Sequence, residues 1–588
     1  MPAFDLIIRG GTIVDGTGET RFTGDVAVKN GLIAQVGTVV GHADREIDAT
    51  GKIVAPGFVD IHTHYDGQAT WDQEMAPSSW HGVTTVVMGN CGVGFAPARP
   101  DRHEWLISLM EGVEDIPGTA LAEGITWEWE TFPEYLDALE KLPRTVDVGT
   151  HVPHGAVRAY VLGDREQPGA VPTDDDIKAM SDIVEEGVRA GALGFSTSRT
   201  VLHKSVDGEL VPGTTATAEE LVAIGHAMGR GQDAGGHAVF EMASDLKREW
   251  NEFEWMGKLS REAGVPVTFA ALQSIAKELP LQEQIDNMRA ENDNGANIVA
   301  QIALRGNGII MAWRGTVHPF VYRPSWHAIA DLPWEEQKPK LLDPEFKAQL
   351  LSETNDYTGA PQDIMEVVMV ITMGWALQYE MDEDFDYEPD ATASVNSRAE
   401  GAGISPQEYA YDMLCREDGS GFIYLPILNY ADGNLDFLHP LQHSDDTVNS
   451  LSDGGAHCGT ICDAASPTFM LEHWVKNRKR GDRITLENAI KRQCHDTAVL
   501  YGLEDRGVIA PGYMADLNVI DLDRLSLGRP WLAFDLPAGG RRLLQKADGY
   551  DFTIKNGIVT FEAGAWTGQA PGGLIRGPQR IELAEAAE

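Results

Sequence analysis

Short apolar runs alternate with longer amphipathic stretches through the middle of the chain. The apolar runs are short enough for strands buried on both faces, and they cover residues 82–89, 146–152, 191–198, 235–242 and 264–272. Residues 173–190 and 217–231 are expected helices that end near glycine, and Thr173 is the expected N-cap of the first, with acids after it. Strand–helix alternation over this length predicts a parallel α/β fold, for which a (β/α)₈ barrel is the economical arrangement.

Both ends of the chain show a different pattern, with short β-rich pieces separated by turn signals. Such pieces cover residues 4–15, 24–37 and 51–57 at one end and 514–523 and 550–564 at the other, with Asn556-Gly557 at an expected hairpin turn. We therefore predict a distorted (β/α)₈ TIM barrel over 56–505 and a small β-sandwich domain formed by both termini, 1–55 and 506–588, the latter with a tail. Residues from about 315 to 410 are rich in Trp, Pro and acids, break the alternation and predict an insertion.

Charge narrows the range of partners. The 588 residues hold 90 Asp+Glu against 46 Lys+Arg, a net charge of -44, and such a surface repels nucleic acid and anionic lipid. Five cysteines are few for this length and fit a reducing compartment. We see no secretory signal and no apolar run long enough for a membrane span, so a cytoplasmic location is expected.

The strongest local signal for chemistry is His62-Thr63-His64. Residues i and i+2 of a strand face the same way, so both imidazoles can hold one metal at the C-terminal end of a first barrel strand. Imidazole suits Zn²⁺ and its neighbours. Such a pair often arises by chance, but here it follows PGFVD at the end of the β-rich leader, which makes the signal far more specific.

Five stretches, in order along the chain, resemble the amidohydrolase superfamily and, within it, the N-acyl-D-amino-acid deacylases, or D-aminoacylases. They are PGFVDIHTHYD (56–66), MGNCGVGFAP (88–97), GALGFST (191–197), LSDGGAH (451–457) and APGYMADL (510–517). The first and fourth resemble the first-strand and last-strand motifs of the superfamily. The second resembles the second-strand motif of the deacylases, where a cysteine is a metal ligand.

The resemblance implies a divalent metal, most simply Zn²⁺, at one or two per chain. Its ligands would be His62, His64, Cys91 and Asp453, and Asp453 would also carry the proton from water to the leaving nitrogen. The plainer interpretations are a buried apolar thiol for Cys91 and a helix-capping turn for Asp453. His457 would contact substrate or support Asp453.

A Gly-His pair of the family, which looks substrate-facing, is matched best by His154-Gly155. A surface or core role is the alternative for His154. Cys458 and Cys462, without a partner pair for zinc, are expected to be structural.

Two features depart from the family pattern. The deacylases carry metal-binding histidines on the fifth and sixth strands, but here Glu241 stands at the fifth-strand position, His237 falls at the start of that strand, and 265–273 holds no histidine. Three hypotheses follow. The chain holds one metal through His62, His64 and Asp453 with Cys91 added, or Glu241 and Gln273 supply oxygen ligands that favour a harder ion, or the site is degenerate.

The second departure concerns the substrate. The deacylases clamp the substrate carboxylate with a basic residue shortly after the last-strand Asp, but residues 460–469 contain no Arg or Lys. Arg199 is our candidate to substitute, with Arg314 and Arg323 as further ones, and each has a structural interpretation too. The aromatic residues of the insertion, Trp313, Phe320, Tyr322 and Trp326, indicate either a bulky apolar substrate or core packing.

The sequence therefore predicts a metal-dependent hydrolase of carbon–nitrogen bonds other than peptide bonds, acting on an N-acyl amino acid or a related N-acyl or aromatic amide. The first alternative is a superfamily hydrolase of a cyclic amide, a urea-like bond or a carbamate. The second is a catalytically silent assembly protein. We expect a small-molecule substrate, a homo-oligomer, and neither nucleic acid nor membrane as a partner.

Overall fold

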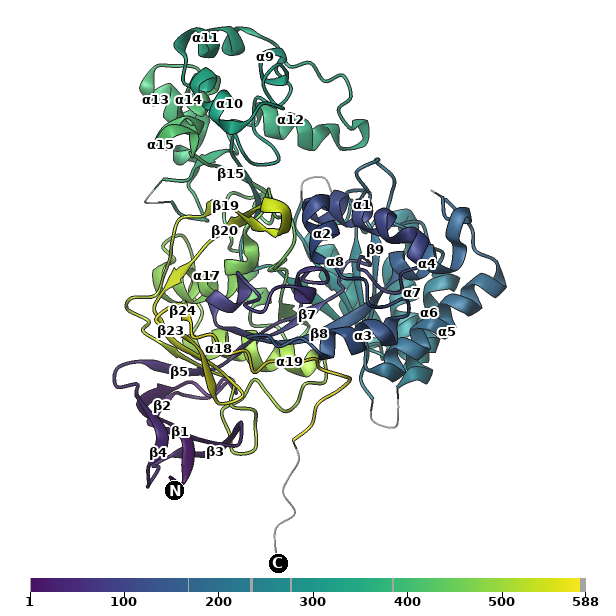
Figure 1. Cartoon of the computed structure of the whole chain (residues 1–588), viewed down its shortest axis with the longest axis vertical. Coiled ribbons are helices and arrows are strands. Elements are labelled where there is room, and N and C mark those ends of the chain that lie inside the picture. The colour runs from purple at the N-terminus through teal and green to yellow at the C-terminus, as the bar shows by residue number, and fades with distance from the viewer. Residues whose placement is uncertain (1, 168, 233–235, 275–277, 383–384, 582–588) are drawn as a thin grey trace, which may run out of the picture.

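The computed structural model describes residues 2–167, 169–232, 236–274, 278–382 and 385–581, so Gly235 of one predicted strand and the end of the predicted tail lie outside the described residues. Eight parallel strands form one curled sheet in chain order (Figure 1). They are β6 (Phe58–Asp60), β7 (Val83–Met88), β8 (Asp147–Pro153), β9 (Gly194–Arg199), β10 (Val239–Ser244), β11 (Val267–Ala270), β12 (Ile298–Ile302) and β16 (Thr447–Asn449). Just past the two edge strands, Thr63 and Gly454 form a parallel bridge that joins the edges. The predicted distorted barrel is confirmed.

Helices cover the outside of this sheet, which is why its strands are buried on both faces. They are α1 (His103–Glu114), α2 (Gly118–Gly124), α3 (Phe132–Glu140), α4 (His154–Leu162), α5 (Asp174–Ala190), α6 (Ala218–Gly231), α7 (Glu252–Ala263) and α8 (Leu281–Asp293). Thr173 caps α5 as predicted, in a reciprocal pair of hydrogen bonds with Asp176, and α5 turns Met180, Val184 and Val188 inward.

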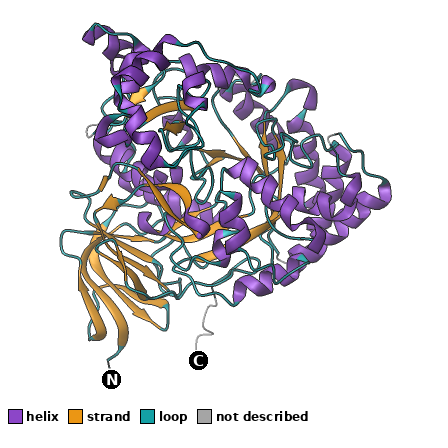
Figure 2. Ribbon diagram, turned by 45° about the horizontal axis from the view of Figure 1, so that its top comes forward, coloured by secondary structure: helices purple, strands orange, loops and turns teal. Residues whose placement is uncertain are grey.

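Both termini meet in a second, nine-stranded sheet, drawn in orange beside the N-terminus in Figure 2. Its strands are β1 (Phe4–Ile13), β2 (Phe22–Lys29), β3 (Leu32–Gly37), β4 (Ala43–Asp48), β5 (Ile53–Pro56), β17 (Leu517–Ile520), β22 (Tyr550–Lys555), β23 (Ile558–Glu562) and β24 (Ala565–Trp566). Asn556 and Gly557 turn β22 into β23 with φ of 51° and 74°, which is the predicted Asn-Gly hairpin. The β domain built from both termini is thus present.

Four buried charges join the barrel to this terminal sheet. Asp147 of β8 accepts hydrogen bonds from Lys555 of β22 at 2.6 Å and from Arg506 at 2.7 Å. Lys555 also donates to Asp516 at 2.8 Å, just before β17. The ammonium of Lys555 is fully buried between the two carboxylates, so the two sheets share one ionic network.

A long excursion leaves the barrel between β12 and β16 and forms the upper part of Figure 1. It holds the antiparallel sheet β13 (Asn307–Met311), β15 (Ile423–Leu428) and β14 (Tyr379–Glu380). Its helices are α9 (Pro324–His327), α10 (Trp334–Leu341), α11 (Pro344–Ser352), α12 (Met365–Met373), α13 (Val395–Ala402), α14 (Pro406–Leu414), α15 (Arg416–Gly419) and α16 (Leu438–Leu441). The regular structure of this excursion therefore begins before residue 315 and continues past 410.

The aromatic residues that mark the insertion in the sequence pack in its own core. Trp313 stacks on Phe320 and Trp326, and Tyr411 of α14 closes the cluster edge-on. Tyr322 lies half-buried against Tyr357. Of the two interpretations that the sequence allowed for these rings, core packing is the one that the structure favours.

The remaining α-helices and strands return the chain to the terminal sheet. They are α17 (Ser466–Phe469), α18 (Leu486–Ile490), α19 (Asp496–Leu500), the hairpin β19 (Trp531–Leu536) and β20 (Gly540–Leu544), and the pair β18 (Ser526–Leu527) and β21 (Ala547–Asp548). Among the described residues, no helix combines the length and the apolar character that a membrane span requires.

Candidate active site

His62 and His64 follow directly after β6, at the C-terminal mouth of the barrel, and each side chain is almost fully buried. Two backbone hydrogen bonds join this segment to the one after β16. His64 N donates to Gly454 O at 2.8 Å, and Asp453 N donates to His62 O at 3.1 Å. The closure of the barrel therefore places Asp453 beside the two histidines, although Asp453 stands 389 positions after His64 in the sequence.

The side chains of His62, His64 and Cys91 offer three ligand atoms that all lie within 4.8 Å of one another. His62 Nε2 lies 3.3 Å from Cys91 Sγ. Asp453 Oδ1 lies 3.6 Å from His62 Nε2 and 3.8 Å from His64 Nε2. Tetrahedral donors 2.0–2.3 Å from one zinc ion stand about 3.3–3.8 Å apart, so these spacings fit such a site.

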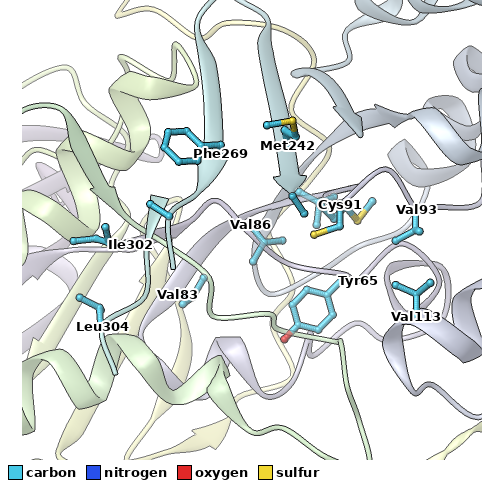
Figure 3. Packing of buried hydrophobic residues seen from close by; sticks show 14 of the residues in the cluster. Tyr65, Val83, Val86, Cys91, Val93, Val113, Met242, Phe269, Ile302 and Leu304 are labelled. Atoms are coloured by element: carbon cyan, nitrogen blue, oxygen red, sulfur yellow. The ribbon is translucent and has the colours of Figure 1, made fainter. Parts of the chain in front are cut away.

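The turn after β7 brings Cys91 into this group. Cys91 has a φ of 54°, and its backbone N–H donates to Glu241 Oε2 at 2.9 Å. Gly92 follows, where a Cβ would lie 2.7 Å from Ser198 N, so glycine permits the close approach of β9. Figure 3 shows Cys91 beside the buried Val86 and Val93. Cys91 thus lies in the hydrophobic core, while its Sγ faces His62 Nε2.

Two further side chains support the imidazoles, and sequence reasoning missed both. Gln301 of β12 accepts at Oε1 from His62 Nδ1 at 2.8 Å and from Ser450 Oγ at 2.7 Å. Because an amide oxygen only accepts, His62 carries its proton on Nδ1 and presents the lone pair of Nε2 to Cys91 and Asp453, as a metal ligand must. Glu114, the last residue of α1, places Oε1 3.1 Å from His64 Nδ1.

Electrostatics at the site favour a bound cation. Burial lowers the pKa of His62 to about 4 and that of His64 well below its ordinary value, which keeps both rings in the neutral form that binds metals. Burial, then Asp463 and Asp60, raises the pKa of Asp453 to about 8. Burial, then nearby carboxylates, raises the pKa of Cys91 well above its ordinary value. A divalent cation reverses these directions, because it stabilises the thiolate and the carboxylate.

None of the other residues considered near the metal, Glu241, Gln273 and His237, belongs to the group of His62, His64 and Cys91. Glu241 of β10 is fully buried, but its Oε1 is 3.9 Å from His62 Nδ1, the nitrogen that faces away from Cys91 and Asp453. Gln273 donates to Asp432 at 2.7 Å, in the excursion. His237 is tied to the carbonyl of Leu500 at 2.7 Å, before β10 begins. We therefore propose Glu241 as a support for the Cys91 turn, and not as a ligand.

The residues expected to contact substrate divide into two groups. His457 stays near the site, with Nε2 3.7 Å from Glu114 Oε2. His154 is fully buried, and its ring nitrogens meet Thr197 at 2.8 Å and Glu220 at 3.0 Å, which leaves neither nitrogen for a substrate. The buried guanidinium of Arg199 bonds to Glu252 at 2.7 Å and to the carbonyl of Ala216 at 2.6 Å. We now propose structural roles for His154 and Arg199.

A parallel barrel that gathers two imidazoles, a thiol and a carboxylate at the C-terminal ends of its strands has the architecture of the metal-dependent barrel hydrolases. Comparison with known proteins defines the group more narrowly. The model of the amidohydrolase family matches residues 45–329 and 438–561, and the chain belongs to that family. The two matched ranges leave out most of the excursion between β12 and β16.

Individual relatives are similar over different lengths. D-aminoacylase of Alcaligenes xylosoxydans xylosoxydans is 32% identical over 268 residues, which are 45% of this chain and 50% of that enzyme. N-acyl-D-aspartate deacylase of the same organism is 27% identical over 523 residues, 88% of this chain and 86% of its own. The crystal structure of N-acyl-D-glutamate deacylase from Bordetella bronchiseptica, complexed with zinc and a phosphonate inhibitor, aligns with a TM-score of 0.62 and 21% identity over 97% of this chain and 99% of that one. That likeness supports the fold.

Proposed function

We propose that the chain hydrolyses the amide bond of an N-acyl amino acid or a related N-acyl or aromatic amide, with His62, His64, Cys91 and Asp453 as the site residues. The observation that carries the proposal is the convergence of these side chains. His62 Nε2 lies 3.3 Å from Cys91 Sγ, and Asp453 Oδ1 lies 3.6 Å and 3.8 Å from the Nε2 atoms of His62 and His64. The names of two relatives add support, because one is a D-aminoacylase and the other an N-acyl-D-aspartate deacylase.

A divalent metal, which we propose to be Zn²⁺ at one or two per chain, would supply Lewis-acid activation of water and of the amide carbonyl. His62, His64 and Cys91, the buried members of the site, would hold it. Asp453 is the more exposed member of the group, with 16% of its side chain accessible against 1–2% for the two histidines. It therefore faces the mouth, where it can accept the proton of the attacking water and then donate it to the leaving nitrogen.

Two of the three basic residues considered as clamps for a substrate carboxylate have internal partners instead. Arg199 pairs with Glu252, and Arg314 lies over the rings of Trp334 and Phe534 at 5.2 Å and 4.0 Å. Arg323 is buried within the excursion, at the start of α9, and two of its guanidinium nitrogens have no hydrogen-bond partner among the described residues. We infer that recognition of the substrate differs from an arginine clamp, and that aromatic amides belong in any test beside N-acyl amino acids.

A panel of N-acyl-D-amino acids, N-acyl-L-amino acids and aromatic amides tests the proposal, with metal content measured on the same sample. We expect amide hydrolysis that is lost on chelation and restored by Zn²⁺, Mn²⁺ or Co²⁺. If the chain hydrolyses only a cyclic amide, a urea or a carbamate, the proposed substrate class is wrong, but the proposed site residues stand. A folded, metal-free chain that turns over nothing would favour the silent assembly protein.

We also propose that the enzyme works in the cytosol as a homo-oligomer. All five cysteines lie in the described ranges and none forms a disulfide, which supports a reducing compartment. Met369 and Met373 of α12 and Leu377 after it are exposed apolar side chains that a second copy could cover. Light scattering of the purified chain measures its oligomeric state.

A further inference from the structure

We propose that Glu114 is a positioning residue of the metal site, which fixes the ring of His64 and anchors the segment that carries Asp453 and His457. The role rests on the proposed function, because it matters only if His64 binds a cation. Nothing in the sequence pattern marks Glu114, which lies on a helix outside the barrel strands.

The carboxylate of Glu114 stands between two histidines. Its Oε1 lies 3.1 Å from His64 Nδ1 and its Oε2 lies 3.7 Å from His457 Nε2. The side chain is 1% exposed. Among the described residues, neither His64 Nδ1 nor Glu114 Oε2 has a hydrogen-bond partner. The 3.1 Å approach of Glu114 Oε1 to His64 Nδ1 is therefore an ion-pair contact, and it places an acceptor oxygen beside that nitrogen. A proton held on Nδ1 leaves the lone pair of Nε2 for the metal, on the side of Asp453.

The backbone around Glu114 holds the same segment. Cys458 N donates to Glu114 O at 3.3 Å, and Gly459 N donates to the carboxylate of Asp115 at 3.1 Å. Thr316 of the excursion donates to that carboxylate too. The preceding residue, Val113, belongs to the same buried hydrophobic cluster as Val93 and Cys91, and Figure 3 labels all three. The end of α1 therefore packs on the core and is hydrogen-bonded to the turn that follows Asp453.

The two ring supports differ in charge. His62 Nδ1 meets the neutral amide of Gln301, whereas His64 Nδ1 meets the carboxyl group of Glu114. Burial, then Asp453 and Asp66, raises the pKa of Glu114 well above its ordinary value, and a bound cation would favour the carboxylate form again. A carboxylate raises the basicity of a metal-bound imidazole more than an amide does, and loss of such an outer partner typically costs roughly 10–100-fold in metal affinity. Glu114 should therefore contribute to affinity through both the charge and the position of its acceptor oxygen.

Competition with a chromophoric chelator for Zn²⁺ measures this contribution in the full-length chain and in the variants Glu114→Ala and Glu114→Gln. We expect Glu114→Ala to bind Zn²⁺ roughly 10–100-fold more weakly. Glu114→Gln should fall between it and the wild type, because glutamine keeps an acceptor oxygen without the charge. Glu220→Gln is the matched control, since Glu220 is also fully buried and pairs with a histidine, His154 at 3.0 Å, away from the metal ligands. It should lower thermal stability and leave Zn²⁺ affinity unchanged.

The outcomes separate the two proposals. Failure of the wild type to bind Zn²⁺ would count against the proposed function. A wild type that binds, with Glu114→Ala within threefold of it, would overturn the role of Glu114. If Glu114→Ala does not fold, Glu114→Gln is the variant that tests the role. Its Zn²⁺ affinity must then be weaker than that of the wild type. The unfolding temperature of its metal-free form shows whether it is folded.

Discussion

Asp453 differs from its neighbours at the site because it is partly open to solvent and lies within 3.8 Å of both imidazoles. The substitution Asp453→Asn keeps the size of the side chain but removes the base. We expect amide hydrolysis to fall about 10²-fold or more, as for the loss of general acid–base catalysis, while metal content and fold remain. Steady-state kinetics and elemental analysis of one preparation check this, and a wild-type rate would remove Asp453 from the mechanism.

Cys91 supplies the one soft donor of the group. Replacing its thiol with a hydroxyl in Cys91→Ser leaves the turn intact, because the backbone bond to Glu241 stays. We expect Zn²⁺ affinity to drop by more than the roughly 10–100-fold that follows loss of an outer partner, with the relative preference for harder ions such as Mn²⁺ increased. Cys494→Ser, at a buried cysteine outside the group, is the control. Equal Zn²⁺ affinity in the wild type and Cys91→Ser would exclude the thiolate as a ligand.

At the scale of elements, local signals were enough for five strands and two helices of the barrel, but they did not place β12 or β16. Alternation placed β7 to β11, and Thr173 with its following acids placed the start of α5. The i, i+2 spacing of His62 and His64, together with the family resemblance, also predicted that both side chains belong to one site. Gln301 and Glu114 could not be predicted in this way, because each meets its histidine only after the barrel has closed and α1 has packed on it. The burial of His154 depends likewise on Glu220, from a different helix.

The excursion between β12 and β16 has its own core, and Trp313 lies at the centre of its rings. We expect Trp313→Ala to reduce the free energy of local unfolding of this unit by about 3–5 kcal/mol, since a large buried side chain is lost. Hydrogen exchange across residues 307–428 measures it. Tyr322→Ala, at a half-buried ring, should cost less. Unchanged hydrogen exchange in Trp313→Ala would contradict a packing role for Trp313. If the variant also lost substrate binding, that result would assign the ring to the substrate site.

At the scale of the whole molecule, Lys555 joins the terminal sheet to the barrel. Burial tends to raise the pKa of Asp147, but the attraction of Lys555 and Arg506 outweighs it and the pKa is lowered from 3.8. A lowered pKa stabilises the fold at pH values above 3.8, and the contribution is lost as pH falls through the native pKa. Protonation of Asp147 at low pH should therefore weaken this network and contribute to acid unfolding.

Removing the ammonium in Lys555→Met leaves two buried carboxylates with one partner fewer. We expect a loss of about 3–5 kcal/mol in the free energy of unfolding at neutral pH. The acid limb of the stability curve should also move to higher pH, because the pKa of Asp147 rises. Urea unfolding as a function of pH measures both effects. Lys29→Met, at a half-exposed surface pair with Asp5, is the control and should change little. An unshifted acid limb in Lys555→Met would show that the network does not link the two sheets energetically.

X-ray absorption at the zinc edge of the zinc-loaded chain shows whether His62, His64, Cys91 and Asp453 surround one cation. We expect a sulfur scatterer at about 2.3 Å beside nitrogen and oxygen scatterers at about 2.0–2.1 Å, with the sulfur shell absent in Cys91→Ser. A shell of oxygen atoms alone in the wild-type chain, or a sulfur shell that persists in Cys91→Ser, would contradict this expectation.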